Sequence, residues 1–131
     1  MLDHIFARYD AVLVLDTETT GISCRKDEII ELAVLKAGQD EAGLCELETM
    51  DEFVRLSEGR HLPDKIVELT GITERMLLDD GISKRQAAEM FSRMFGERTL
   101  IVAYNAQFDL CFLYYFLAQF GMADVLQGAK M

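Results

Sequence analysis

An apolar run that stops at two carboxylates is the sequence feature that most constrains the fold of this chain. Residues 11–15 (AVLVL) are β-branched and apolar throughout, and Asp16 and Glu18 come directly after them. A continuous run of this kind predicts a strand buried on both faces of a sheet. Because side chains alternate along a strand, Asp16 and Glu18 are expected to point to the same face. Taken alone, the pair fits a solvated strand end equally well.

Three further strands follow from similar patterns. Residues 28–35 (EIIELAVL) predict a second strand, and the Gly and Asp residues of 37–43 predict a turn. A third strand is expected to end near 53–56, and 100–103 (LIVA) predict a short fourth strand.

The middle of the chain is expected to be helical. Pro63 suits a first helical position and Gly71 suits the residue just past a helix end, so 63–69 predict a short helix. A capping-box pattern that begins at Ser83 opens a second helix, which Gly96 ends. The expected order is β-β-β-α-α-β-α, an α/β domain with a mixed sheet.

A third carboxylate is predicted at the same edge of the sheet. Asn105 follows the fourth strand and can cap a helix that runs to about Phe120, which places Asp109 near the first helical turn. If the fourth strand lies parallel to the first, Asp109 overhangs the edge that carries Asp16 and Glu18. The alternative for Asp109 alone is an acid that interacts favourably with a helix N-terminus.

Charge restricts the partners of the chain. It carries 23 acidic and 13 basic residues, a formal net charge of −10, which is the wrong sign for holding nucleic acid by phosphate contacts alone. Any nucleic-acid interaction is therefore expected to be that of an enzyme, with divalent ions between acids and phosphate.

The length of 131 residues predicts one domain, 1–131. The sequence shows no export signal and no apolar run long enough for a membrane span. Its cysteines, Cys24, Cys45 and Cys111, are odd in number and widely spaced. They fit a reducing cytoplasm better than a disulfide framework or a zinc site, so we expect a cytoplasmic protein.

Three motifs in order resemble a known enzyme family. They are DTETTG (16–21), LTGIT (69–73) and NAQFDLCFL (105–113). On its own, LTGIT reads as a connection between helices. Together, and with EIIELAV (28–34) and LPDKIVELTGIT (62–73) between them, they resemble the DnaQ-like 3′–5′ exonucleases with the DEDDh pattern. The resemblance covers about residues 11–121 and implies a ribonuclease H-like mixed sheet flanked by helices.

The resemblance also implies roles for residues. Asp16, Glu18 and Asp109 match the catalytic carboxylates that hold two divalent ions, Mg²⁺ or Mn²⁺, in this family. Substrate contacts are implied for Thr17, Thr19, Thr20, Leu69, Thr70, Asn105 and Phe108. The implied activity is removal of nucleotides from single-stranded or frayed 3′ ends of DNA, with RNA as an open alternative and a DNA polymerase as an open partner.

The chain departs from the family in its third motif, a His followed five residues later by an Asp. Its two histidines, His4 and His61, both precede Asp109. The one acid after Asp109 is Asp124, and Gln119 stands five residues before it. We therefore expect a domain that lacks its C-terminal third, with poor or no activity of its own, since the His acts as general base.

A different class of function is suggested by the helix expected over 106–120. Its apolar side chains wrap nearly all round it, and such a helix needs cover on every side. A homo-oligomer that buries this helix is one expectation. The alternative to an enzyme is a non-catalytic remnant or interaction module that associates through it.

Overall fold

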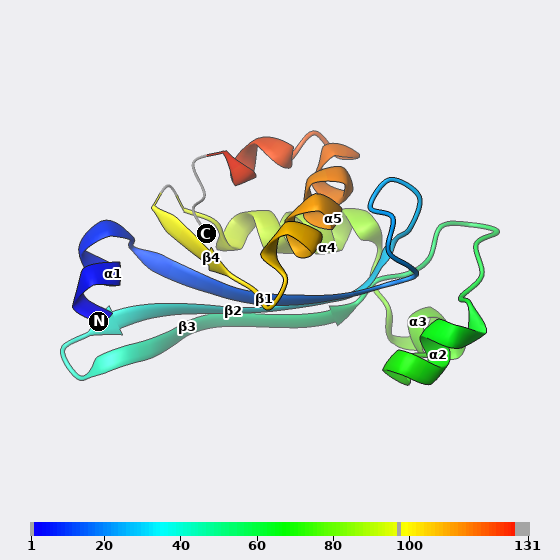
Figure 1. Ribbon diagram of the computed structural model, residues 1–131, viewed down its shortest axis with the longest axis horizontal. Helices are drawn as coiled ribbons and strands as arrows, with labels where there is room; N and C mark the ends of the chain where they lie inside the picture. The colour runs from blue at the N-terminus through cyan, green and yellow to red at the C-terminus, as the bar shows by residue number, and fades with distance from the viewer. Residues whose placement is uncertain (1, 97, 128–131) are drawn as a thin grey trace.

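A four-stranded mixed sheet forms the centre of the computed structural model, which describes residues 2–96 and 98–127. Its strands are β1 (Ala11–Thr19), β2 (Ile29–Asp40), β3 (Gly43–Phe53) and β4 (Thr99–Val102), in the order β3-β2-β1-β4. The first three form an antiparallel meander, and β4 pairs with β1 in parallel. The predicted mixed sheet and its parallel fourth strand are confirmed (Figure 1).

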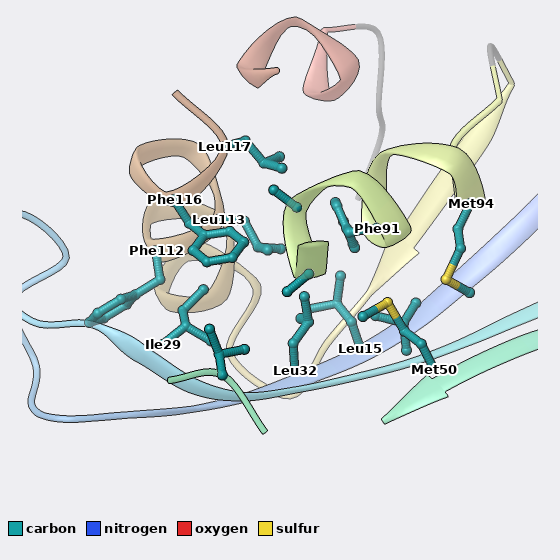
Figure 2. Close-up of a cluster of buried hydrophobic side chains, with 14 of the residues drawn as sticks. Leu15, Ile29, Leu32, Met50, Phe91, Met94, Phe112, Leu113, Phe116 and Leu117 are labelled. Atoms are coloured by element: carbon teal, nitrogen blue, oxygen red, sulfur yellow. The ribbon is translucent and has the colours of Figure 1, made fainter. Parts of the chain in front are cut away.

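One face of this sheet is covered by two helices, α4 (Lys84–Met94) and α5 (Ala106–Ala118) (Figure 1). Figure 2 shows the core that results, in which side chains of β1 and β2 meet those of both helices. Leu13, Phe91 and Leu113 are fully buried there. The core therefore holds the start of α5 against the end of β1.

The opposite face of the sheet is open, which corrects the prediction of a strand buried on both faces. Along β1 the odd-numbered residues are buried, whereas Val14 is 43% exposed. Leu35 and Val102 are exposed on the neighbouring strands. The apolar run 11–15 reflects β-propensity on this face rather than burial.

The predicted helix ends are largely found in the structure. Pro63 precedes α2 (Asp64–Thr70), and Gly71 ends it with a φ of 76°, a conformation that favours glycine. The side chain of Ser83 accepts a hydrogen bond from the Gln86 amide at the start of α4. Local capping chemistry thus fixes where these helices begin and end.

Three short elements and one strand extension were not predicted. They are α1 (Leu2–Arg8), α3 (Glu74–Asp80), the 3₁₀ turn η1 (Ala123–Leu126) and the continuation of β2 through 37–40. Gly38, expected in a turn, pairs with Cys45 inside the β2–β3 ladder. Each helix has about two turns or fewer, too short for an apolar period to identify it.

Helix α5 receives more cover than the sequence suggested. Phe112, Leu113, Phe116 and Leu117 are buried, and residues of η1 pack against the same core. Tyr114 is the large side chain of this helix that stays exposed. The homo-oligomer through this helix remains a prediction.

The expectation of unpaired cysteines is wrong for two of the three. Cys24, in the loop between β1 and β2, forms a disulfide with Cys111 of α5, and their Cα atoms lie 5.9 Å apart. Cys45 remains a free thiol. The pair is 87 residues apart in sequence, so only the fold brings the two thiols together.

Within residues 2–96 and 98–127, no helix combines the length and the apolar character that crossing a membrane requires.

Replacing Leu113 by Ala should lower the free energy of unfolding by about 2–5 kcal/mol, because it leaves a cavity at a fully buried position. The matched control, Leu78→Ala, removes the same atoms from a side chain that is 65% exposed and should cost much less. Urea denaturation followed by circular dichroism measures both. Equal losses in the two variants would show that α5 does not pack as described.

Candidate active site

Asp16 and Glu18 lie on the open face of the sheet, at the end of β1. The alternation along β1 places their side chains on the same face as Val14, while Leu15 and Thr17 point toward the helices. Asp16 is exposed and Glu18 is half-buried. The predicted common face of the two acids is therefore present.

Asp109 approaches the same strand end from the helix side. Asn105 caps α5 by accepting a hydrogen bond from the Phe108 amide at 3.4 Å, which sets Asp109 in the first turn. The Asp109 side chain is only 4% exposed, and its Oδ1 accepts a 2.6 Å hydrogen bond from Thr17 Oγ1. Because β1 and β4 run in parallel, the start of α5 and the end of β1 meet at one edge of the sheet.

Two of the three carboxylates, Glu18 and Asp109, have raised pKa values. Burial raises the pKa of Glu18, and the charges of Asp16 and Asp109 raise it further. Burial also raises the pKa of Asp109, and the charge of Asp16 adds to this, although the hydrogen bond from Thr17 opposes it. The structure thus concentrates negative charge at this edge, and none of these three acids forms an ion pair with a residue in 2–96 or 98–127.

Sequence reasoning missed two further acids on this face. Glu31 of β2 lies directly opposite Glu18 in the β1–β2 ladder, and Asp51 of β3 lies opposite Ala33, the partner of Asp16. The pKa of Glu31 is raised to about 7 by burial, by a hydrogen bond with Asp51 and by the charges of its acidic neighbours. The sequence did contain a signal for Glu31, because it is an acid at an outward-facing position inside the apolar run EIIELAV.

The donor set of Asp16, Glu18 and Asp109 fits a divalent ion in its chemistry. Carboxylate oxygens are the ligands that Mg²⁺ and Mn²⁺ prefer. Among the residues that the structure describes, however, no three Asp, Glu, His or Cys side chains are arranged around one ion position. The hydrogen bond from Thr17 engages Oδ1 of Asp109, and a carboxylate has a second oxygen that can bind an ion.

The threonines implied as substrate contacts use their hydroxyl groups within the protein. Thr17 donates to Asp109, Thr19 donates to the Gly21 carbonyl at 2.6 Å, and Thr20 donates to Asp27 at 3.0 Å. All three side chains are buried. Their hydroxyls therefore shape the turn after β1 rather than face solvent.

The remaining implied contact residues lie on separate elements. Leu69 is exposed at the end of α2, and the Thr70 hydroxyl donates to the Ile66 carbonyl. Phe108 is half-buried on α5, with its ring 4.8 Å from that of Phe112. Figure 1 places α2 and α3 beyond the end of the sheet, on the side away from α5, so these contact residues belong to helices that lie apart.

A network of ion pairs, also missed in the sequence, holds the loop after β1. Arg60 pairs with Asp27 at 2.9 Å, and Lys84 pairs with Glu28 at 2.7 Å. Burial alone would raise the pKa of Glu28, but hydrogen bonds from Lys84 and Ser57 outweigh it and the pKa is lowered. The loop 20–28 is thereby tied to the segment before α2 and to the start of α4.

Neither histidine is placed to assist the carboxylates. His61 is exposed and its Nδ1 lies 3.0 Å from Glu74 Oε1, at the start of α3. His4 lies in α1, near the opposite end of the sheet in Figure 1. The site as described therefore contains acids and no imidazole.

Comparison with known proteins decides the family. The family model described as Exonuclease (RNase_T) matches residues 13–130. The chain belongs to this exonuclease family. The resemblance predicted from the three motifs is thereby confirmed.

Similar proteins include two polymerases. The chain is 38% identical over 103 residues to DNA polymerase III PolC-type of Thermotoga petrophila, covering 77% of this chain and 7% of that protein. It is 37% identical over 111 residues to the PolC-type enzyme of Halalkalibacterium halodurans, covering 84% and 7%. The chain thus spans less than a tenth of the length of these relatives.

Solved structures show the same fold. Exonuclease I of E. coli in complex with a dT13 oligonucleotide matches with a TM-score of 0.73 at 20% identity, covering 84% of this chain and 24% of that one. Exonuclease I of Methylocaldum szegediense gives a TM-score of 0.78 at 20% identity, covering 92% and 27%. These matches confirm the ribonuclease H-like exonuclease fold.

The raised pKa of Glu31 predicts a pH effect on stability. The Glu31 carboxyl has a pKa of about 7 in the folded chain and an ordinary pKa in the unfolded chain. Its proton therefore stabilises the fold fully when the pH is below the pKa of the unfolded state. That stability is lost as the pH rises through about 7. In the presence of a chelator, the melting temperature should therefore fall as the pH rises from 5 to 8. Glu31→Gln should reduce this fall, because the Gln amide cannot ionise and can still form a hydrogen bond with Asp51.

Glu46→Gln, a change at an exposed glutamate of β3, is the matched control and should leave the pH dependence as it is. Thermal unfolding at several pH values measures all three proteins. The same pH profile in Glu31→Gln and the unmodified chain would contradict the assignment.

Proposed function

We propose that this chain is a 3′–5′ exonuclease unit that removes nucleotides from 3′ ends of single-stranded nucleic acid, DNA in the first place. The observation that carries the proposal is the meeting of Asp16, Glu18 and Asp109 at one sheet edge in a member of the exonuclease family. The names of its relatives agree with a role at DNA, since they include PolC-type polymerases and an Exonuclease I bound to an oligonucleotide.

Divalent ions, Mg²⁺ or Mn²⁺, supply Lewis acidity and lower the pKa of bound water in reactions of this class. In this chain Asp16, Glu18 and Asp109 are the residues proposed to hold them. Asp16 is the exposed member of the three, while Thr17 sets the position of Asp109 through its hydrogen bond. A cation held there would offset the negative charge that, together with burial, raises the pKa of Glu18 and of Asp109.

We assign the positioning of the substrate to residues around this edge of the sheet. The turn 19–21 lies directly after the acids, and its threonine side chains hold its shape through hydrogen bonds within the loop. Phe108 offers a partly exposed ring on α5, and such rings bind bases without sequence preference. In this proposal Leu69 and Thr70 contact the substrate only if α2 moves toward the end of β1 when the substrate binds.

The activity of this 131-residue chain alone is proposed to be weak. Proton transfer by a positioned general base typically contributes about 10²–10⁴ in rate, and neither histidine lies at the carboxylates. The alternative of an interaction module through α5 is less favoured, because most apolar side chains of this helix are buried within the chain.

The proposal is tested with a 5′-labelled single-stranded oligonucleotide and Mn²⁺. A ladder that shortens from the 3′ end is expected, slow in the unmodified chain and absent with a chelator. Asp16→Asn should reduce it by about 100-fold or more, since even changes to partners of metal ligands cost up to about that factor.

Asp79→Asn serves as control, because Asp79 lies in α3, where it pairs with Arg75 at the surface, and the variant should retain full activity. The same variants are melted with and without Mn²⁺, and Asp16→Asn should lose the metal-dependent rise in melting temperature. A ladder that persists in Asp16→Asn would refute the site.

A further inference from the structure

A hollow of about 310 Å³ lies between the loop after β1 and helix α5, away from the three carboxylates. We call it the loop–α5 hollow. Its lining includes cationic, aromatic and polar side chains, among them Arg25, Lys26, Phe112, Tyr115, Phe116 and Gln119. A hollow of this size is in the range of small-ligand sites, and the Cys24–Cys111 disulfide joins its two walls.

Its charge is positive, in contrast to the chain as a whole. The two acids in the lining are already paired, Asp27 with Arg60 and Glu28 with Lys84. Arg25 and Lys26 form no ion pair with any residue in 2–96 and 98–127. Two uncompensated cations therefore face one hollow in a chain of net charge −10.

One aromatic ring in the hollow is set for stacking. The Arg25 guanidinium lies 5.8 Å from the centre of the Tyr115 ring, and its Nε donates a 3.0 Å hydrogen bond to the Tyr115 hydroxyl. Tyr115 is only half-buried, whereas Phe112 and Phe116 beneath it are buried. A fixed ring beside cations that form no ion pair suits a single-stranded nucleic acid, with a base on the ring and a phosphate on the cations.

Helix α5 links the hollow to the proposed active site. The ring of Phe108, next to Asp109, contacts that of Phe112, which lines the hollow. With a rise of 1.5 Å per residue, Tyr115 lies about 10 Å further along the helix than Phe108. That distance suits a nucleotide upstream of the one at the carboxylates.

We infer that the loop–α5 hollow is a second nucleotide subsite, which binds a nucleotide upstream of the 3′ end through Tyr115, Arg25 and Lys26. The inference rests on the proposed function, which places the 3′ end of the bound nucleic acid at the carboxylates. Binding at the hollow is measured separately from cleavage, so that the two can fail independently.

The experiment measures binding of 5′-fluorescein dT10 by anisotropy, with a chelator present to prevent cleavage. Arg25→Gln/Lys26→Gln should weaken binding and lower the slope of log affinity against log salt by about 1.4, roughly 0.7 for each phosphate contact in a single strand. Arg8→Gln/Arg93→Gln removes two exposed charges elsewhere and should change neither quantity.

The aromatic part is tested with Tyr115→Leu and Tyr115→Phe. The Leu variant should lose about tenfold in affinity for dT10, and the Phe variant should keep it, because stacking needs the ring and not the hydroxyl. Thermal melting establishes that each variant is folded.

The outcomes separate the two proposals. Variants that bind dT10 as tightly as the unmodified chain, with an unchanged salt slope, overturn the subsite even if the 3′ ladder is intact. Loss of affinity restricted to the hollow variants supports the subsite even if no ladder forms. Equal losses in the control double variant point to general charge attraction and also overturn it.

Discussion

The two-residue period of β1 is the constraint on which the rest of the structure depends. It sends Leu13 and Leu15 into the core beneath α4 and α5, and it sends Asp16 and Glu18 to the open face. Thr17 falls between the acids and points the other way, where it can meet Asp109. A shift of one residue in register would exchange the core and the acids, so the packing of the sheet and the position of the site are determined together.

The acidic face then carries a cost in stability that a bound cation can offset. Glu31 and Asp51 share one hydrogen bond on that face, and their neighbours Asp16 and Glu18 add negative charge. Raised pKa values for Glu18, Glu31 and Asp109 mean that each ionised form is disfavoured in the folded chain. Such an arrangement is expected where charge serves a ligand rather than the fold.

Sequence patterns were sufficient where the physics is local. Apolar runs identified β1 and β2, and caps such as Ser83 and Gly71 fixed helix ends within a residue or two. Contacts between residues far apart in the sequence could not be predicted from such local patterns. The opposition of Glu18 and Glu31 depends on the register of two strands, and the open face of β1 depends on both long helices packing on one side.

Charge segregation gives an acidic chain a way to admit a nucleic acid. Exposed acids gather on β3 and on the turn between β2 and β3, at Glu41, Glu46 and Glu48, where they repel phosphates. Around the loop after β1 the acids are neutralised by Arg60 and Lys84, so the cations of that loop remain free. A polyanion would therefore meet repulsion at the hairpin end of the sheet and attraction at the cations of the loop after β1, although the chain as a whole carries a charge of −10.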